Sequence, residues 1–266
     1  MPGKSLLIAT WNINSVRLRA PLVAAFVREA KPDVICLQEI KCQNDQFPAK
    51  AFAAMGLKHL HIVGQKGWHG VAIASRLPLE PLPAPALCRH GEARAGAVKV
   101  AGIELHNLYV PAGADIPDPD VNPKFDHKLD VLAKMKSEYA KRKGKGPLVV
   151  VGDLNVAPGE HDVWSHKQLL DVVSHTPIET ERLEAARNAG GLVDAARHHK
   201  PAPEKLFTWW SYRSPDWTKN NRGRRLDHIW ASPDLAAVSS GYTIHQACRG
   251  WEKPSDHVPV TLSLKL

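Results

Sequence analysis

Short apolar runs that end in polar residues recur along the chain. Residues 5–14 begin with such a run, Leu6 to Ala9, and similar runs occupy residues 33–39, 70–75, 103–110, 147–152 and 258–264. An apolar run of roughly four to eight residues with polar or turn residues at its ends is typical of a buried β-strand. Residues 207–210 and 225–230 are predicted as further strands.

Three other segments show helical spacing. The apolar residues of 22–30 share one face after Pro21, and proline suits the first turn of a helix because its missing N–H is not needed there. Asn122 can cap a second helix, in which apolar residues follow at helical spacing over 125–139. Residues 180–190 are predicted as a third helix.

The predicted strands and helices do not alternate regularly. Several strands are joined by segments too short for a crossover helix, which argues against a Rossmann fold. We therefore expect an α+β fold with mixed, largely antiparallel sheets and helices outside them. The proline-rich residues 78–85 are predicted as a loop, because strand patterns continue on both sides. The whole chain, 1–266, is expected to form a single domain.

Composition limits the class of protein. Hydrophobic residues make up 44% of the chain and charged residues 23%, which is typical of a globular protein with a sizeable core. The net charge of +8 and the pI near 9.3 favour a polyanionic partner without establishing one. The apolar N-terminal run is too short for a signal peptide, and no stretch is long enough to span a membrane. We expect a cytoplasmic protein without a membrane partner.

The four cysteines are scattered. No pair has the close Cys/His spacing of a zinc site, and the density is far below that of a disulfide scaffold. Cys36 lies in an apolar run, where a packed, reduced thiol is expected. The sequence therefore predicts neither a zinc site nor a disulfide framework.

Polar side chains cluster where the predicted strands end. They are Asn12, Asn14, Glu39, Asn107, Tyr109, Asp153, Asn155, Asp227, His228, Asp256 and His257. Any one of them could be a strand-end cap, but strand ends on one rim of a sheet converge in space. Hard oxygen ligands without cysteine suit Mg²⁺ or Mn²⁺. Together these residues predict one acidic site for such an ion.

Eight segments stand in the order expected of one family. They are WNINSVR, LQEIK, GWHGVAI, NLYVPAG, VVVGDLNVAP, FTWWSYRS, NRGRRLDHIWAS and KPSDHVPV. From about Ala9 to Val260 the chain resembles the exonuclease III family of DNA repair nucleases, which includes apurinic/apyrimidinic endonucleases, within the endonuclease/exonuclease/phosphatase superfamily. GDLN and SDH indicate only the superfamily, whereas LQEIK, NLYVPAG and WWSYRS with KPSDH are much more specific. The resemblance implies a DNase I-like four-layer α/β sandwich.

The resemblance also implies a magnesium site, for which Mn²⁺ could substitute. Glu39 would be the main ligand, with Asn12 and Asp256 close by. Asp153 would activate the attacking water and could also touch a metal. Asn155, counted among the residues of the metal site, would point the same way if the chain stays extended, and would orient the water or donate a hydrogen bond to the phosphoryl oxygen.

Two further residues are placed near the phosphate by the resemblance. His257 would bind the scissile phosphate, beside or on the metal, and stabilise its charge if protonated. An acid would hold its ring, and either Asp256 or Asp227 could do so, because adjacent residues on an extended chain usually face apart. Tyr109 would donate a hydrogen bond or, with a depressed pKa, act electrostatically.

The expected DNA-binding surface is basic and aromatic. Trp209 and Leu226 match an apolar pocket for a flipped-out abasic sugar. Trp217 could stack or wedge at the duplex. The expected phosphate contacts are Arg17, Arg19, Arg213, Lys219, Arg222 and Arg224.

Two residues depart from the family pattern. Asn14 stands where some relatives carry an acid, which puts a fully occupied second metal site in doubt. Arg224 stands where relatives specialised for abasic sites can carry a bulky apolar residue, which puts the strength of abasic selectivity in doubt.

The sequence thus predicts a Mg²⁺-dependent, monomeric hydrolase acting on double-stranded DNA. It would incise 5′ to abasic sites, and act at 3′ ends as a 3′-to-5′ exonuclease and 3′-phosphodiesterase. A superfamily phosphatase or lipid phosphodiesterase is the first alternative, against which the basic charge and WWSYRS argue. A non-catalytic DNA-binding protein is the second, but it predicts a missing ligand or base, and none is missing.

Overall fold

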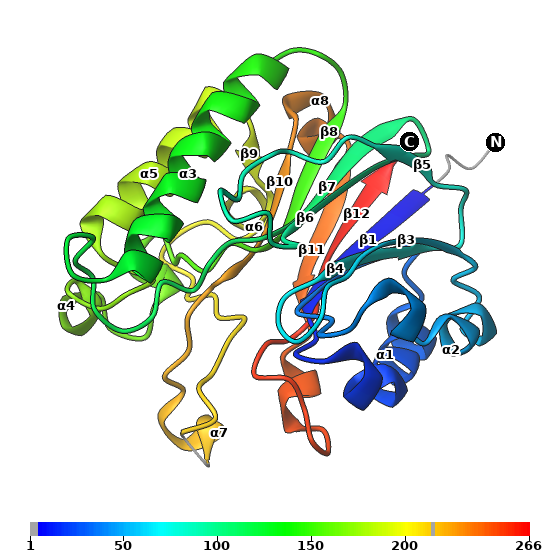
Figure 1. Cartoon of the computed structure of the whole chain (residues 1–266), viewed down its shortest axis with the longest axis horizontal. Coiled ribbons are helices and arrows are strands. Elements are labelled where there is room, and N and C mark those ends of the chain that lie inside the picture. The colour runs from blue at the N-terminus through cyan, green and yellow to red at the C-terminus, as the bar shows by residue number, and fades with distance from the viewer. Residues whose placement is uncertain (1–4, 214–215) are drawn as a thin grey trace.

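Two six-stranded β-sheets lie face to face in the computed structural model, which describes residues 5–213 and 216–266 (Figure 1). The first sheet has the order β11 (Ser239–Ile244), β12 (Val260–Lys265), β1 (Ser5–Asn12), β2 (Val34–Gln38), β4 (Val71–Ser75), β3 (His59–Val63). The second has the order β5 (Glu80–Leu82), β6 (Ala95–Val100), β7 (Ile103–Tyr109), β8 (Leu148–Asp153), β10 (Asp227–Ala231), β9 (Val193–Asp194). Among the strand pairs of the described residues, only β1–β2 and β7–β8 are parallel. The predicted mixed, largely antiparallel sheets are confirmed.

Helices cover the outer faces of both sheets, which completes the predicted four layers (Figure 1). Helices α1 (Val16–Ala30) and α2 (Ala49–Ala54) lie on the first sheet, and α3 (Pro123–Arg142) and α5 (Pro177–Ala189) on the second. The remaining helices are short: η1 (Asn44–Gln46), η2 (Glu160–Asp162), α4 (His166–Leu169), α6 (Ala195–His199), α7 (Trp217–Asn220), α8 (Pro233–Ala237) and η3 (Gln246–Gly250). Among the described residues, no helix is long and apolar enough to cross a membrane.

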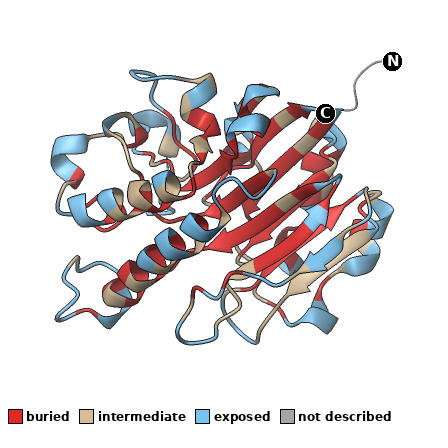
Figure 2. Cartoon of the chain, turned by 90° about the horizontal axis from the view of Figure 1, so that it is seen from above, coloured by how far each residue is buried: buried red, intermediate tan, exposed pale blue. Residues whose placement is uncertain are grey.

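The strands are apolar on both faces because each sheet is covered on both sides. In β1, Ile8 points between the sheets, whereas Trp11 packs under α1. In β2, Cys36 points between the sheets and Leu37 under α1. Figure 2 shows the resulting block of buried strands between helices whose outer faces are exposed. The predicted packed thiol of Cys36 is confirmed, and burial raises the pKa of that thiol.

Two predicted helix starts move towards the N-terminus. Helix α1 begins at Val16 and leaves helical geometry at Arg19 (φ −113°, ψ 15°), so Pro21 lies in the first turn of its second part. Helix α5 begins at Pro177, because Thr176 and Glu179 form a capping box ahead of the predicted start. The Asn122 cap of α3 is confirmed by its side-chain oxygen, which accepts hydrogen bonds from two backbone amides.

Other strand predictions need correction. Residues 207–210 form no strand, and isolated bridges join Trp209 to Arg224 and to His257. A short strand, β5, lies within 78–85, which was predicted as a loop. Strands β3, β6, β9 and β11 were not predicted; β3, for example, is half-buried throughout and lacks a buried apolar run.

Candidate active site

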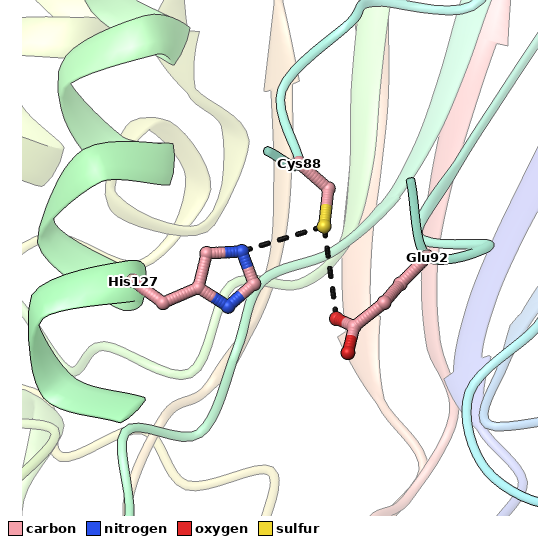
Figure 3. A group of neighbouring side chains, drawn as sticks. All are labelled: Cys88, Glu92 and His127. Atoms are coloured by element: carbon pink, nitrogen blue, oxygen red, sulfur yellow. Dashed lines mark hydrogen bonds between the residues drawn. The ribbon is translucent and has the colours of Figure 1, made fainter. Parts of the chain in front are cut away.

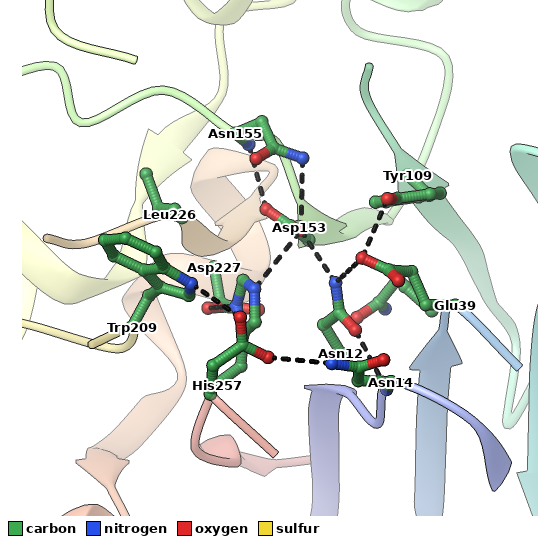
Figure 4. A network of polar contacts seen from close by, with 12 residues as sticks. Asn12, Asn14, Glu39, Tyr109, Asp153, Asn155, Trp209, Leu226, Asp227 and His257 are labelled. Atoms are coloured by element: carbon green, nitrogen blue, oxygen red, sulfur yellow. Dashed lines mark hydrogen bonds and ion pairs between the residues drawn. The ribbon is translucent and has the colours of Figure 1, made fainter. Parts of the chain in front are cut away.

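Strand register brings most of the predicted polar residues to one end of the two sheets (Figure 4). Tyr109, Asp153 and Asp227 are direct neighbours across β7, β8 and β10. Asn12 comes from the facing end of β1 in the other sheet, and its amide nitrogen reaches Asp153. The pairing therefore places residues far apart in sequence side by side.

Gly152 allows the close approach that positions Asp153. Its φ is +142°, and a Cβ at this position would lie 1.9 Å from the carbonyl oxygen of Leu108 on the neighbouring strand. Any other residue would push β7 and β8 apart. The glycine of the GDLN segment is thus needed for the geometry of the acid that follows it.

Glu39 follows β2 in a left-handed backbone conformation, with φ of +49°. For a residue other than glycine this costs about 1 kcal/mol, and it turns the carboxylate into the site. The carboxylate accepts hydrogen bonds from Asn12 Nδ2 (2.9 Å) and Tyr109 Oη (2.8 Å) and pairs with Lys41 Nζ (2.9 Å). Burial alone would raise the pKa of Glu39, but Lys41 and these hydrogen bonds outweigh it and lower the pKa, so the group is ionised.

Tyr109 is a hydrogen-bond donor in this structure. Burial, followed by the charges of Glu39 and Asp153, raises the pKa of its hydroxyl well above the usual value. The alternative of a tyrosine with a depressed pKa is therefore wrong. The hydroxyl stays protonated and donates to Glu39.

Asp153 is buried, with 1% of its surface exposed. It accepts hydrogen bonds from Asn12 Nδ2 at 2.9 Å and Asn155 Nδ2 at 3.1 Å. Burial raises the pKa of Asp153, and the charges of Asp227 and Glu39 add to the rise. A carboxylate with a raised pKa is a stronger base than an ordinary surface carboxylate.

Asn155 reaches Asp153 by a different route from the one expected. The segment is not extended, because Asn155 has a φ of +54°. Its Nδ2 donates to Val110 O at 2.8 Å as well as to Asp153, so both N–H bonds are engaged. The side chain holds the base in place, and its amide oxygen is the group left to face a water.

His257 is held by Asp227. The distance from His257 Nδ1 to Asp227 Oδ2 is 2.8 Å, whereas Asp256 accepts hydrogen bonds from Trp209 Nε1 (2.9 Å) and Asn14 Nδ2 (3.2 Å). Of the two acids left open by the sequence, Asp227 is therefore the partner. Burial alone would lower the pKa of His257, but Asp227 and Asp153 outweigh it and raise the pKa. A protonated ring has no free lone pair, which favours a cationic role over metal ligation.

The acidic residues fit a hard divalent cation. The carboxylates of Glu39 and Asp153 both accept from Asn12 Nδ2 at 2.9 Å, and carboxylate oxygens of Asp153 and Asp227 lie within 4.8 Å of each other. Asp227 Oδ1 is buried without a hydrogen-bond partner among the described residues. Carboxylate and amide oxygens without thiolate are the donor set of Mg²⁺ or Mn²⁺.

The sequence reading missed Lys41, the second residue after Glu39 in the LQEIK segment. Its ammonium lies 2.9 Å from Glu39 Oε2 and 2.6 Å from Asn14 Oδ1. A protein cation thus already occupies the space between the main acid and Asn14. The LQEIK segment contained this signal, because a lysine two residues from an acid can turn back onto it.

A buried ion pair beneath Asn155 was also missed. Lys128 and Glu179 are fully buried and in contact, and Lys128 Nζ donates to Asn155 O at 2.8 Å. Glu179 in turn accepts from the backbone amide of Ser174. This pair supports the backbone turn that carries Asn155. Lys128 lies on the apolar face of α3, three residues after Phe125 and four before Leu132, so a lysine at a core position of the helix was the available signal.

Two residues of the predicted rim do not face the site. Asn107 is fully buried between the sheets, where it donates to Leu37 O and Ala72 O. His228 is fully buried beside Arg225 and hydrogen-bonds Val156 O. Side chains alternate along a strand, so His228, next to Asp227, points into the core. Asn107 lies on the same face of β7 as Tyr109 but two residues further from the end of the strand, where it contacts the other sheet.

Trp209 and Leu226 lie together beside the acidic residues (Figure 4). Leu226 is buried and Trp209 half-buried against the same small apolar cluster. Arg224 Nη1 donates to Val173 O (2.9 Å) and Ser174 Oγ (2.7 Å), and its guanidinium lies 5.4 Å from the centre of the Trp209 ring. Arg224 therefore packs on one wall of the expected sugar pocket.

The other predicted DNA contacts differ in accessibility. The exposed residues among them are Arg17, Arg213, Lys219 and Arg222. Ser214, the last residue of the FTWWSYRS segment, lies outside the described residues. Trp217 is half-buried, with its ring centre 5.1 Å from that of Trp210. Arg19 is buried and donates to backbone oxygens and to Tyr212, so the prediction that it contacts phosphate is wrong.

Comparison with known proteins identifies relatives along nearly the whole chain. The model of the endonuclease/exonuclease/phosphatase family matches residues 9–257. Exodeoxyribonuclease III of Haemophilus influenzae is 30% identical, over 96% of this chain and 98% of that protein. An AP endonuclease from Archaeoglobus fulgidus superimposes with a TM-score of 0.91 at 33% identity, over 98% of this chain and all of that one. A 3′ phosphatase from Neisseria, solved with a product DNA hairpin, gives 0.89 at 32% identity, over 98% and 100%.

Proposed function

Because the chain belongs to the endonuclease/exonuclease/phosphatase family, and within it to the exonuclease III and AP endonuclease group, we propose that it is a Mg²⁺-dependent DNA repair nuclease. It incises duplex DNA 5′ to abasic sites and removes nucleotides or blocking groups from 3′ ends. The observation that carries the proposal is the line Asp227–His257–Asp153 beside Glu39. Asp153 would provide a buried base, His257 a cationic phosphate-binding group and Glu39 a cation-binding acid, all within one small site.

The residues divide the chemistry between them. Glu39 and Asp153 would hold Mg²⁺, or Mn²⁺ in its place, with Asn12 and Asp256 nearby, and the ion supplies charge neutralisation at the phosphate and the leaving oxygen. Asp153 takes a proton from the attacking water, and Asn155 keeps its carboxylate in place. The protonated ring of His257 stabilises the negative phosphoryl oxygens.

Asp227 and Tyr109 hold two of these groups in position. Asp227 holds the ring of His257 through Nδ1, which leaves Nε2 directed at the reacting phosphate. Tyr109 fixes the carboxylate of Glu39 by donating to it. Neither residue needs to change its protonation state during the reaction.

The substrate is double-stranded DNA with an abasic site or an accessible 3′ end. Trp209 and Leu226 would accept an extruded abasic sugar, and extrusion costs least where no base is stacked. Arg17, Arg213 and Arg222 would contact phosphates on either side, and Trp217 would support the duplex. The relatives reported above include an exodeoxyribonuclease, an AP endonuclease and a 3′ phosphatase, and they support the proposed action at abasic sites and at 3′ ends. We further propose that the single domain 1–266 acts as a monomer.

One assay tests the proposal. End-labelled duplexes, one with a synthetic abasic site and one with a recessed 3′ end, are incubated with Mg²⁺ and then with EDTA. We expect cleavage of both with Mg²⁺ and of neither with EDTA. Cleavage that survives EDTA would exclude the metal mechanism, and failure on both duplexes with Mg²⁺ would exclude the nuclease.

Asp153→Asn separates catalysis from binding. It should abolish turnover and leave duplex binding largely intact, because the amide keeps the shape of the acid but cannot take up the proton. Asp171→Asn, at an exposed carboxylate, is the matched control and should cleave normally. A loss of duplex binding as large as the loss of turnover would mean that Asp153 is structural.

A further inference from the structure

Cys88, Glu92 and His127 form a second group of side chains that could bind a metal ion (Figure 3). The loop between β5 and β6 carries Cys88 and Glu92, and it passes beside α3, which carries His127. Cys88 Sγ lies 3.3 Å from His127 Nε2 and 3.6 Å from Glu92 Oε2, and the three ligand atoms lie within 4.8 Å of one another. The fold thus joins a cysteine and a histidine that are 39 positions apart, which spacing along the chain did not reveal.

These distances are close to the edges of a tetrahedral zinc site. With a Zn–S bond of ~2.3 Å and Zn–N and Zn–O bonds of ~2.0 Å, tetrahedral angles place the sulfur ~3.5 Å from both the nitrogen and the oxygen. The observed separations are 3.3 Å and 3.6 Å. Small side-chain rotations would therefore suffice to bind an ion.

A catalytic cysteine triad would be arranged differently. There the acid bonds the second nitrogen of the histidine and orients the ring towards the sulfur. Here Glu92 Oε2 faces the sulfur itself, and Glu92 Oε1 lies 3.4 Å from His69 rather than beside His127. Three donor atoms converging on one another are the arrangement of ligands around an ion.

Cys88 is also the accessible cysteine. Cys36, Cys42 and Cys248 are buried, whereas Cys88 is half-buried and lines, with Glu92, a cavity of about 420 Å³. An ion has an entry path through this cavity, and water can complete its coordination. The ring of His90, 4.4 Å from that of His127 between centres, is a further nitrogen donor nearby.

We propose that Cys88, Glu92 and His127 form a binding site for Zn²⁺ or a chemically similar divalent cation. The thiolate and imidazole select it over Mg²⁺, which prefers oxygen ligands. The site does not depend on the nuclease reaction.

The bound ion would fix the loop to α3 and to the wall of the active site. Glu92 Oε2 also accepts a hydrogen bond from Arg94 Nε at 2.5 Å, and the Arg94 guanidinium lies 4.9 Å from the centre of the Tyr109 ring. The loop has no regular secondary structure between β5 and β6. An ion that joins this loop to His127 of α3 should therefore stabilise the folded state.

The test uses Co²⁺ as a spectroscopic substitute for Zn²⁺, added to the whole protein with excess Mg²⁺. We expect one equivalent to produce the near-ultraviolet sulfur-to-cobalt absorption of a thiolate complex, and Zn²⁺ to displace it. Cys88→Ser should abolish the absorption, and His127→Gln and Glu92→Gln should weaken Co²⁺ binding at least tenfold. Zn²⁺ should raise the melting temperature of the wild type and not of Cys88→Ser.

The active-site variant Asp153→Asn is the control and should keep the full absorption, which makes this outcome independent of the nuclease proposal. Absence of the sulfur-to-cobalt band in the wild type would overturn the site. So would a band that persists in Cys88→Ser, or one that Asp153→Asn removes. If Cys88→Ser fails to fold, as circular dichroism would reveal, Glu92→Gln decides: unchanged affinity in that variant overturns the site.

Discussion

Asp227 Oδ2 lies 2.8 Å from His257 Nδ1, although Asp256 is the acid next to His257 in the chain. The register of β8 and β10 places Asp227 directly opposite Asp153, so all three groups meet. The other ring nitrogen, Nε2, is 3.7 Å from Asp153 Oδ2. The carboxylate of Asp227 therefore holds the ring through Nδ1, and the carboxylate of Asp153 lies near the other ring nitrogen.

Asp227→Asn should lower kcat by about a hundredfold or more, with a much smaller change in KM. The amide keeps a hydrogen bond to the ring but removes the charge that most strongly raises the pKa of His257. The pKa of His257 should therefore fall, so the ring should lose its proton at a lower pH than in the wild type. Single-turnover cleavage against pH and an NMR titration of the ring measure the two effects.

Asp256→Asn is the matched control for this variant. Its carboxylate contacts Trp209 and Asn14 rather than the ring. Its effect on the NMR titration of His257 should be clearly smaller than that of Asp227→Asn. Equal effects of the two variants would contradict the assignment of Asp227 as the partner.

Arg224→Trp should raise abasic-site incision relative to exonuclease activity, by about tenfold. Arg224 now contacts Val173 O and Ser174 Oγ beside Trp209, and its Nε is buried without a partner among the described residues. A bulky apolar side chain would extend the wall formed by Trp209 and Leu226. The ratio of the two rates on matched duplexes is the measurement.

Arg222→Trp provides the comparison, because Arg222 is exposed and its guanidinium lies over Trp164 rather than over Trp209. It should weaken binding to both duplexes and leave the ratio of the two rates unchanged. An unchanged ratio in Arg224→Trp would count against the pocket argument.

The sequence predicted the sheets well because their signal is local. Apolar runs such as those of β1, β2 and β8 are buried on both faces, and a residue of the site ends β1 and β8 and directly follows β2. The strand order and register were not predicted, because the apolar runs themselves do not specify which strands pair. The half-buried edge strand β3 has no such run and was missed.

The sequence alone could not show which of two neighbouring polar residues faces the site and which is buried in the core. Asn107 and Tyr109 lie two positions apart on one strand, yet Asn107 bonds backbone oxygens in the core and Tyr109 bonds Glu39. The difference arises from where the opposite sheet lies. Glu39 and Asn155 enter the site through left-handed backbone conformations, which no pattern of apolar residues encodes.

Lys41→Met should tighten binding of the divalent cation, by about fivefold. The ammonium lies 2.9 Å from Glu39 Oε2 and 2.6 Å from Asn14 Oδ1, so its removal leaves the ionised acid without a compensating cation and Asn14 Oδ1 without its lysine partner. The Mn²⁺ affinity and stoichiometry, measured by electron paramagnetic resonance, test this. Lys145→Met, at an exposed turn, is the control, and an affinity unchanged in both variants would show that Lys41 does not compete with the ion.

Asp162 should link the stability of the fold to acid pH. It is buried against Arg225, with Oδ1–Nε 2.7 Å and Oδ2–Nη2 2.9 Å, and it also contacts Arg197. Burial alone would raise the pKa of Asp162, but the two guanidinium groups outweigh it and lower the pKa to about 2, from 3.8. The folded state therefore binds this proton more weakly than the unfolded state does.

The sign of the effect follows from that difference. The ionised pair contributes fully above pH 4, and its contribution of about 2 kcal/mol is lost as the pH falls towards 2. Asp162→Asn should lower the free energy of unfolding at pH 7 by about 3 kcal/mol, because it leaves Arg225 with one buried acid, Asp194, instead of two. Below pH 4 the difference between variant and wild type should shrink. Urea midpoints from pH 2 to 7 measure this, with Asp171→Asn as the exposed control; a difference that stays constant over this range would mean that the pair does not set the pKa of Asp162.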